Sequence, residues 1–319
     1  MEIHGIFVVI RVENFRIMTC LDYLIDYLLK EDSRYSEMEI PSDLQGKRDL
    51  FRALRNVRPP HPVSEEFLRL QDDELQAQLQ EKGVVELPQL PTLNSKLPTT
   101  LNSKPSTLNS QHPTTLNSKP STLNSQHPTA LNSKPSTLNY ILWQGDITRL
   151  RVDAIVNAAN SQMLGCFHPL HRCIDNAIHS AAGVQLRQEC HEMMLRQGHE
   201  EPTGQAKITK AYNLPCKHVI HTVGPIVPNG IPTEFQQEQL ASCYRSVMAC
   251  AAENKLESVA FCCISTGEFR FPNQLAAEIA VRTVKDFLSE NPNCSVKTVV
   301  FNVFKDVDWA IYRSLMDEI

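Results

Sequence analysis

Residues 152–160 read VDAIVNAAN, an apolar run followed by two asparagines that two alanines separate. Similar apolar runs recur towards the C-terminus, and amphipathic stretches with helical spacing lie between them. We expect strands at residues 152–156, 219–223, 258–264 and 298–304, and helices from about His171, over 234–254 and over 273–290. Strands that alternate with helices predict a layered α/β fold with a largely parallel sheet.

The loops that follow these strands are the places to look for a site, because ligands of such sheets bind outside the carboxyl ends of the strands. Asn157 and Asn160 follow the first strand, with only Ala158 and Ala159 between them. Their amides suit hydrogen bonds to sugar hydroxyls, and the small residues let a ligand approach the backbone. Each asparagine taken alone is equally typical of a turn cap.

A second loop, Ser265-Thr266-Gly267-Glu268-Phe269, follows the strand expected at 258–264. Pro272 comes shortly after it and suits a first helical turn. Backbone N–H groups in front of a helix bind phosphate through aligned dipoles. A Ser-Thr-Gly loop by itself is weak evidence for such a site.

Residues 165–173, GCFHPLHRC, concentrate cysteine and histidine in front of a helix. Zinc takes thiolate and imidazole ligands tetrahedrally, and three protein ligands leave the fourth position open in catalytic sites. We expect Cys166, His171 and Cys173 to bind one Zn²⁺, and we rank His168 below His171 because it lies beside Pro169. The C-x4-H-x-C spacing is not that of a standard zinc finger, so packed cysteines with a surface histidine are an equally weighted alternative.

Asp175 and His179 lie four residues apart on the helix after the cysteines and therefore share a face. We expect this face to lie opposite the stripe that packs in the core. Asp175 lies within one turn of Cys173, although an acidic residue there is also typical of a cap or dipole partner. His179 is expected to be a hydrogen-bonded, partly buried histidine rather than a site residue.

The N-terminal part predicts a small helical module over residues 12–87. Leu21, Leu24, Ile25 and Leu28 form one apolar stripe, a second helix ends at Arg58 before the prolines, and Ser64 caps a third helix that reaches about Glu81. Residues 88–139 are expected to be a disordered linker, because TTLNSKPSTLNSQHP repeats there with too few apolar residues to form a core. An O-glycosylated stalk or a partner ligand is the alternative.

Composition excludes several classes of protein. The chain has 319 residues, 42% of them hydrophobic, and a formal net charge of −5, so we expect no nucleic acid as the main partner. No uninterrupted apolar run predicts a membrane span, and Met1–Arg11 lacks the features of a secretory signal. The ten cysteines lack disulfide spacing. We therefore expect a cytoplasmic or otherwise intracellular protein with reduced thiols, and a monomer because no long apolar stripe is left over.

Five segments in order resemble the macrodomains that bind ADP-ribose: GDIT (145–148), VDAIVNAAN (152–160), CIDNAIHSAAG (173–183), TGQAKITKAYNLPCKHVIHTVGP (203–225) and ISTGEFRFP (264–272). The resemblance covers residues 140–319 and implies a three-layer α/β/α macrodomain with a mixed, largely parallel sheet. The segment 165–173 resembles the zinc-dependent, MacroD-like subgroup, which removes ADP-ribose from proteins. RALRNVRPPHPVSEEFL (52–68) resembles the N-terminal helical extension of that subgroup.

The resemblance also implies a role for each site residue. Asp146 would receive the adenine amino group with Ile147 beside it, and Asn160, together with Asn157, would meet the distal ribose. The loop formed by Ser265, Thr266, Gly267, Glu268 and Phe269 would wrap the diphosphate. Zinc held by Cys166, His171 and Cys173 would lie against the distal ribose, and Asp175 would be the acidic residue of the catalytic helix.

The expected activity is zinc-dependent hydrolysis that releases ADP-ribose from mono-ADP-ribosylated proteins. Zinc would act as a Lewis acid, and Asp175 would orient or deprotonate water, with Asn160 as the second catalytic candidate. The alternatives are a reader that binds ADP-ribose without hydrolysis and a zinc ion with only a structural role. The long repeat departs from the family pattern, but closure entropy grows slowly with loop length, so we still expect the module to pack on the domain.

Overall fold

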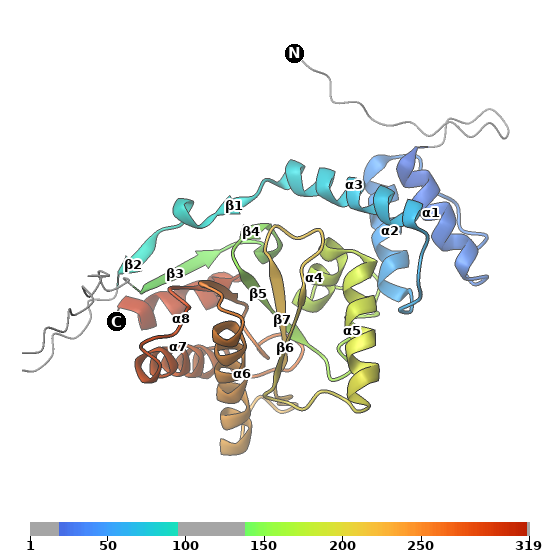
Figure 1. Cartoon of the computed structure of the whole chain (residues 1–319). Helices are drawn as coiled ribbons and strands as arrows, with labels where there is room; N and C mark the ends of the chain where they lie inside the picture. The colour runs from blue at the N-terminus through green and yellow to red at the C-terminus, as the bar shows by residue number, and fades with distance from the viewer. Residues whose placement is uncertain (1–18, 95–137, 318–319) are drawn as a thin grey trace, which may run out of the picture.

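A seven-stranded mixed sheet lies at the centre of the structure, a computed structural model that describes residues 19–94 and 138–317 (Figure 1). Its strand order is β2-β3-β9-β8-β5-β7-β6. The inner strands are parallel: β3 (Asn139–Gln144), β9 (Thr298–Val303), β8 (Ser258–Phe261), β5 (Ala154–Ala159) and β7 (His218–Val223). The edge strands β2 (Thr92–Asn94) and β6 (Ala206–Lys210) are antiparallel to their neighbours. The predicted α/β fold with a mixed, mostly parallel sheet is confirmed.

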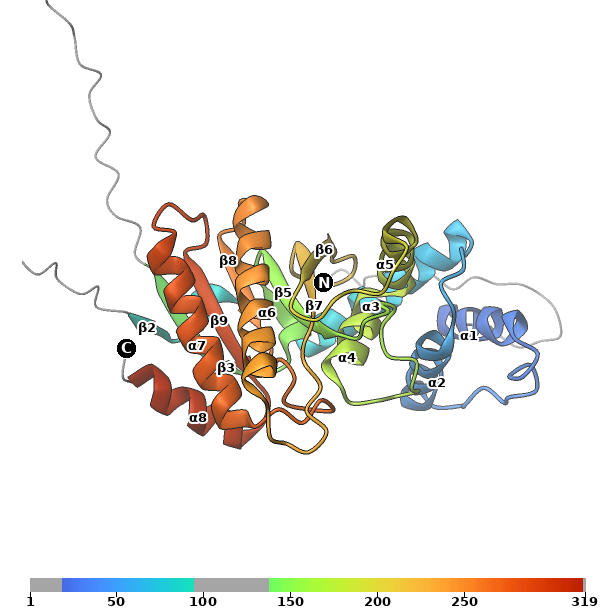
Figure 2. The same cartoon turned by 90° about the horizontal axis from the view of Figure 1, so that it is seen from below.

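Two groups of helices pack along this sheet. Helices α4 (Ile174–Ala182) and α5 (Val184–Gln197) contact each other and lie beside β5 and β6, whereas α6 (Glu234–Glu253), α7 (Asn273–Glu290) and α8 (Asp306–Asp317) form the second group (Figure 2). The helices predicted over 234–254 and 273–290 are confirmed. The helix predicted from about His171 begins instead at Ile174, because Cys173 has extended backbone and its sulfur accepts the N–H of Asn176 as an N-cap.

The strand at the centre of the site runs further than predicted. β5 begins at Ala154 and continues to Ala159, so Asn157 lies inside the strand and not in the loop after it. The reason is that the amide of Asn157 finds buried hydrogen-bond partners, which lets a polar residue continue an interior strand. At the other end, Asp153 accepts the N–H groups of Glu257 and Ser258 and so precedes the strand. β8 is shorter than predicted and ends at Phe261.

The N-terminal module has three helices and a hydrophobic core of its own. α1 (Cys20–Glu31), α2 (Leu44–Val57) and α3 (Glu65–Lys82) bury a cluster made of Leu21, Leu24, Ile25, Leu28, Leu29, Phe51, Leu54, Phe67 and Leu70. The predicted stripe on α1, the end of α2 before Arg58 and the Ser64 cap of α3 are all confirmed. The residues expected from 12 to 18 lie outside the described part of the chain.

Part of the segment predicted to be a disordered linker belongs to the sheet. In that segment, β2 pairs with β3. The residues just before it are also ordered: β1 (Val85–Glu86), in the range predicted for the helical module, pairs with β4 (Leu150–Arg151) in a separate two-stranded sheet, and a short 3-10 helix covers Leu87–Gln89. Residues 92–94 and Asn139, which the prediction placed in the linker, are therefore held in the sheet by backbone pairing. The repeat falls largely in residues 95–137, outside the described residues, and it joins the partner residues Asn94 and Asn139 of neighbouring antiparallel strands. The chain thus reaches the sheet before the repeat begins.

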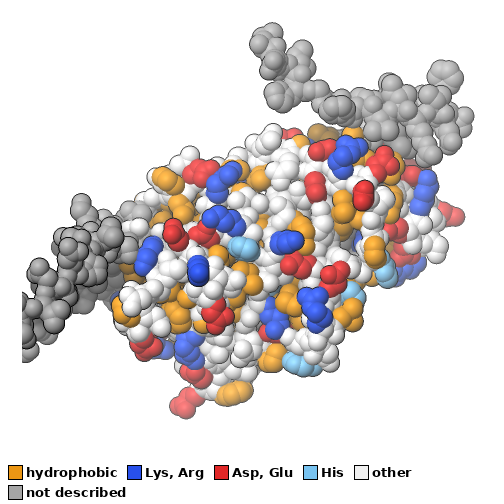
Figure 3. Space-filling model, viewed as in Figure 1, with side chains coloured by type: hydrophobic (Ala, Val, Ile, Leu, Met, Phe, Trp, Pro, Cys, Tyr) orange, Lys and Arg blue, Asp and Glu red, His pale blue; other side chains and the backbone are white. Residues whose placement is uncertain are grey.

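Charged side chains of both signs are mixed on the face of the molecule shown in Figure 3. In the described ranges no helix is both long and apolar enough to cross a membrane. The place to look for a site is the carboxyl edge of the parallel strands, because ligands of such sheets bind in the loops there.

Candidate active site

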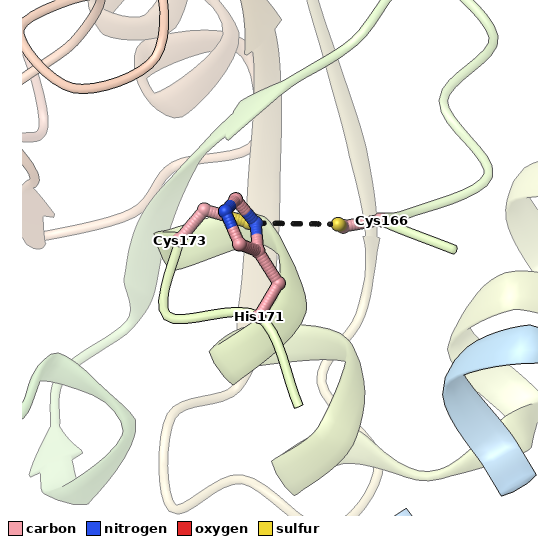
Figure 4. A group of neighbouring side chains, drawn as sticks. All are labelled: Cys166, His171 and Cys173. Carbon is pink, nitrogen blue, oxygen red and sulfur yellow. Dashed lines mark hydrogen bonds between the residues drawn. The ribbon is translucent and has the colours of Figure 1, made fainter. Parts of the chain in front are cut away.

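The predicted metal ligands converge. One ligand atom each from Cys166, His171 and Cys173 lies within 4.8 Å of the other two, and Cys166 Sγ is 3.5 Å from His171 Nδ1. Figure 4 shows the Cys166 sulfur facing the imidazole ring, with the Cys173 sulfur behind that ring. All three residues are partly exposed, so a ligand can reach them. His168, the alternative histidine ligand, is exposed, and its Nδ1 lies 3.3 Å from the carbonyl oxygen of Pro169.

Two thiols and one imidazole are a donor set that suits zinc, and one face of the group is accessible for a fourth ligand. Burial, together with the nearby Cys166 and Asp175, raises the pKa of Cys173 to about 12, against the hydrogen bond from the Asn176 amide. A thiol in this environment keeps its proton near neutral pH unless a cation displaces it. The residues present therefore fit a bound Zn²⁺.

Asp175 lies immediately behind these ligands at the start of α4. Its carboxylate accepts from Asn157 Nδ2 at 2.8 Å, and Asn160 Nδ2 lies 3.5 Å from its second oxygen. Burial raises the pKa of Asp175 to about 6, although the hydrogen bond from Asn157 and the charge of Arg187 act in the opposite direction. The two asparagines of VDAIVNAAN thus orient a buried acidic group next to the metal ligands.

The face of α4 that carries Asp175 is buried, which contradicts the prediction that it lies opposite the core-facing side. This face lies against the sheet, where Asp175 accepts from Asn157 of β5 and the ring of His179 lies 6.1 Å from that of His221 on β7. Helix α2 packs on the neighbouring face of α4, which carries Asn176 and Ser180. His179 also differs from the partly buried, hydrogen-bonded side chain that was predicted. Its side chain is only 4% exposed and neither ring nitrogen has a hydrogen-bond partner among the described residues, although Nε2 lies 3.5 Å from Asp175 Oδ1. Burial, followed by the charges of His221 and Arg187, lowers its pKa well below the usual value.

Sequence reasoning missed His221, which lies behind Asn157 on β7. Its Nδ1 is 3.1 Å from Asn157 Nδ2, and its Nε2 is 2.9 Å from Thr209 Oγ1. Since the amide nitrogen can only donate, Nδ1 accepts and Nε2 carries the proton. Burial lowers the pKa of His221 to about 3, so the ring is neutral. A histidine inside the apolar run HVIHTV was the available signal, because a buried imidazole needs polar partners.

The two asparagines differ in what they can touch. Asn160 is partly exposed at the carboxyl end of β5, where its Oδ1 accepts the N–H of Gln162 and its Nδ2 donates to the carbonyl of Gly165. Asn157 is fully buried, and its Oδ1 has no hydrogen-bond partner among the described residues. Asn157 therefore supports Asp175 from behind, whereas only Asn160 reaches the surface of the site.

The loop Ser265–Phe269 approaches the metal ligands from the carboxyl end of β8. Glu268 Oε1 lies 3.5 Å from His171 Nε2, which joins the two loops directly. Ser265 has a left-handed backbone with φ 65°, and its buried Oγ has no hydrogen-bond partner in the described part of the chain. A Cβ on Gly224 would lie 2.0 Å from that oxygen, so glycine is required after β7 to admit the loop. Gly267 and Glu268 are exposed.

Asp146 and Ile147 follow β3 at the same edge of the sheet. Asp146 Oδ1 accepts the N–H and hydroxyl of Thr148 at 3.0 Å and 2.6 Å and caps the 3-10 helix η2 (Ile147–Arg149), which contacts α4. Ile147 is buried. The edge of the sheet therefore presents, in sheet order, the partly exposed Asp146, the loop after β8, and Asn160 with the metal ligands.

Comparisons with known proteins agree with this geometry. The Macro domain family matches residues 156–280. A protein-ADP-ribose hydrolase from Treponema medium is 47% identical over 294 residues, which cover 92% of this chain and 97% of the relative. The chain belongs to the macrodomain family. A second protein-ADP-ribose hydrolase, from Staphylococcus aureus strain MSSA476, is 42% identical to this macrodomain protein over 92% of its length and 93% of the relative.

Solved macrodomain structures have the same fold. A macrodomain variant from Oceanobacillus iheyensis with ADPR is 37% identical, with a TM-score of 0.52, and the match covers 58% of this chain and 96% of that one. The Trypanosoma brucei macrodomain in complex with ADP-ribose is 25% identical, with a TM-score of 0.55, over 82% of this chain and 93% of that one. The longer match extends beyond the 180 residues of the predicted domain into the N-terminal part.

Proposed function

We propose that this macrodomain protein is a zinc-dependent hydrolase that binds ADP-ribose at the carboxyl edge of its sheet and releases mono-ADP-ribose from modified proteins. The observation that carries the proposal is the convergence of Cys166, His171 and Cys173 beside the buried carboxyl group of Asp175. A macrodomain that only binds its ligand has no need of a half-exposed thiol pair next to an oriented carboxyl group. The names of the relatives support the hydrolase activity.

In this proposal, bound zinc supplies a Lewis acid at the ribose end of the ligand. Asp175 would hold a water molecule through its carboxylate and accept its proton, while the water oxygen bonds to the ribose carbon and the bond from that carbon to the protein side chain breaks. The protein side chain leaves with the bonding electrons, so that no separate nucleophile is needed. Asn157 and Asn160 fix the two oxygens of Asp175, which keeps the carboxylate aimed at that water. Asn160, at the surface, also offers its amide to a ribose hydroxyl.

The rest of the edge suits the nucleotide. Asp146 Oδ1 is taken up by Thr148, which leaves Oδ2 as the oxygen that would accept the adenine amino group, and Ile147 packs beneath it. The exposed backbone at Gly267 and Glu268 follows a strand and precedes α7, which suits a diphosphate. Asn157 is assigned the support of Asp175 and not a direct contact with ribose.

The test is incubation of the full chain with a mono-ADP-ribosylated protein, with and without a zinc chelator. We expect release of free ADP-ribose that the chelator abolishes and added zinc restores. A reader would bind ADP-ribose in both conditions and release nothing. If zinc were only structural, the chelator would lower the melting temperature while ligand-saturated turnover survived below that temperature.

A further inference from the structure

The loop that carries the metal ligands has little structure of its own. Between β5 and α4, the described residues form no helix or strand, and Met163, Gly165 and Leu170 all have left-handed backbone, with φ values of 63°, 78° and 54°. Leu170, directly before His171, is also 42% exposed. A non-glycine residue in this conformation persists only where its surroundings hold it. The loop has few hydrogen bonds of its own, such as that from the His171 N–H to the His168 carbonyl at 3.3 Å, so contacts from outside help to set where the ligands lie.

Helix α2 of the N-terminal module makes the contacts that hold this loop. Asn56 Oδ1 accepts the N–H of Leu170 at 3.1 Å, at the residue with the unfavourable backbone. Arg52, one helical turn earlier, donates through Nη2 to the carbonyl oxygen of His171 at 3.1 Å. Arg52 and Asn56 lie at positions i and i+4 on one face of α2. Their side chains thus hydrogen-bond to two consecutive loop residues, the second of which is the metal ligand His171.

The same arginine reaches the other end of the ligand group. Arg52 Nη2 donates to Asn176 Oδ1 at 2.6 Å, and Asn176 in turn donates its N–H to Cys173 Sγ at 3.4 Å and its side-chain amide to the carbonyl of His168 at 3.0 Å. Asn176 is fully buried. Arg52 therefore fixes His171 directly and Cys173 through one intermediate residue.

Arg187 of α5 completes the connection. Its Nε donates to the carbonyl of Leu164 at 2.6 Å, and its guanidinium lies 4.2 Å from the ring centroid of Phe167, next to Cys166. Its Nη1 donates to the carbonyls of Arg55 and Asn56 at the end of α2, at 3.0 Å and 2.9 Å. The module and the ligand loop thus share one buried cation.

We propose that the N-terminal module is part of the metal-binding apparatus, with Arg52 and Asn56 as positioning residues for the ligand loop. The inference rests on the proposed zinc site. Groups that orient metal ligands from outside typically change metal affinity by about 10- to 100-fold when they are removed. Coupling of this kind is reciprocal, so bound zinc should also tighten the docking of α2 on the loop.

The chain offers a matched control, because the module also docks at a distance from the loop. Asp72 of α3 accepts from Asn213 Nδ2 at 2.6 Å and from Gln185 Nε2 at 2.9 Å. Loss of these contacts weakens docking without touching the ligand loop. The test compares Arg52→Gln, Asn56→Ala and Asp72→Ala in the full chain.

The readout is the zinc dissociation constant, measured by competition with a chromophoric chelator and not by activity. We expect Arg52→Gln and Asn56→Ala each to weaken zinc binding by about 10-fold or more, and Asp72→Ala to stay within about 2-fold of the parent at a comparable loss of thermal stability. Equal weakening in all three variants would mean that the module acts only through general stability and would overturn the proposal.

Two further outcomes separate this inference from the proposed function. If the parent chain binds one zinc and both α2 variants bind it equally well, the role of the module is wrong and the zinc site survives. If the parent chain binds no zinc, both fail together. Hydrogen exchange gives an independent readout, because zinc should slow exchange at the Leu170 amide in the parent chain and not in Asn56→Ala.

Discussion

Two groups of cysteine and histidine in the described residues bring potential metal ligands within 4.8 Å of one another: Cys166, His171 and Cys173, and the group of His179, Cys190 and His221. In the second group, Cys190 Sγ lies 3.9 Å from His221 Nε2. Both groups thus combine cysteine with histidine, and their ligand atoms lie within the same distance of one another. What differs is that the first group is partly exposed in a loop, whereas the second is buried between α4, α5 and β7.

This difference decides what each group can do. In the buried group both nitrogens of His221 are engaged, one by Asn157 and one by Thr209, so a metal would have to displace the Thr209 contact. Burial raises the pKa of Cys190 as it does that of Cys173, so the thiols do not separate the two groups. We interpret the buried group as neutral support for Asn157 and Asp175, and the exposed group as the metal site. Proximity of ligand atoms alone does not separate the two.

The largest effect is expected when one cysteine is removed from each group. We expect Cys166→Ala to lose its zinc and to reduce turnover by about 1,000-fold or more, because Lewis-acid stabilisation of the transition state is worth several kcal/mol. Cys190→Ala should keep one zinc per chain and lose only stability, by about 1 kcal/mol. Zinc content by elemental analysis and release of ADP-ribose measure both effects.

Circular dichroism of both variants serves as the folding control. A Cys190→Ala chain without zinc, or a Cys166→Ala chain that still holds one, would reverse the assignment of the two groups.

The exposed group was largely predictable from the sequence and the buried group was not. Cys166, His171 and Cys173 lie within eight consecutive residues, so a local pattern identified them. His179, Cys190 and His221 come from separate elements and meet only through the pairing of β5 with β7 and the packing of α4 on the sheet. The contacts of Arg52 and Asn56 span more than 110 residues of sequence and leave no local signal.

In the fold, too, the features set by local sequence were predictable and those set by distant contacts were not. Helices α6 and α7 followed from periodicity, because their buried faces are set by residues three and four apart. The extent of β5 did not, because Asn157 is tolerated inside a strand only through partners on α4 and β7. The early strands β1 and β2 were also missed, since they are short and are ordered by pairing with β4 and β3.

Asp175 lies between the exposed metal-ligand group and the buried group that supports Asn157, so its substitution gives a second test. Asp175→Asn preserves the shape of the side chain and removes the group that accepts a proton. We expect kcat to fall by about 100- to 10,000-fold while zinc content stays at one per chain. Steady-state kinetics beside elemental analysis would measure this. Turnover that survives in the variant would place the proton acceptor elsewhere and leave Asp175 as an acidic residue in the first turn of α4.

The smallest expected effect is on stability and concerns the buried group alone. Burial lowers the pKa of His221 to about 3, whereas the unfolded chain protonates this histidine near its usual value. Below about pH 6.5 the unfolded state therefore binds more protons, and the free energy of unfolding falls as the pH drops towards 3, by up to about 1.4 kcal/mol per pH unit. His179 contributes in the same direction.

Asp175 opposes this trend, because its raised pKa lets the folded state hold a proton between about pH 6 and pH 4. A comparison of the parent chain with His221→Gln cancels that contribution, since Asp175 is common to both. In chelator-treated protein, urea unfolding at pH 7.5 and 5.5 should show a loss that is smaller in His221→Gln by about 1.4 kcal/mol. An equal loss in both chains would mean that His221 takes up its proton at the same pH in the folded and the unfolded chain. The buried group would then carry a positive charge beside Asp175 at pH 5.5, in place of the neutral support assigned to it.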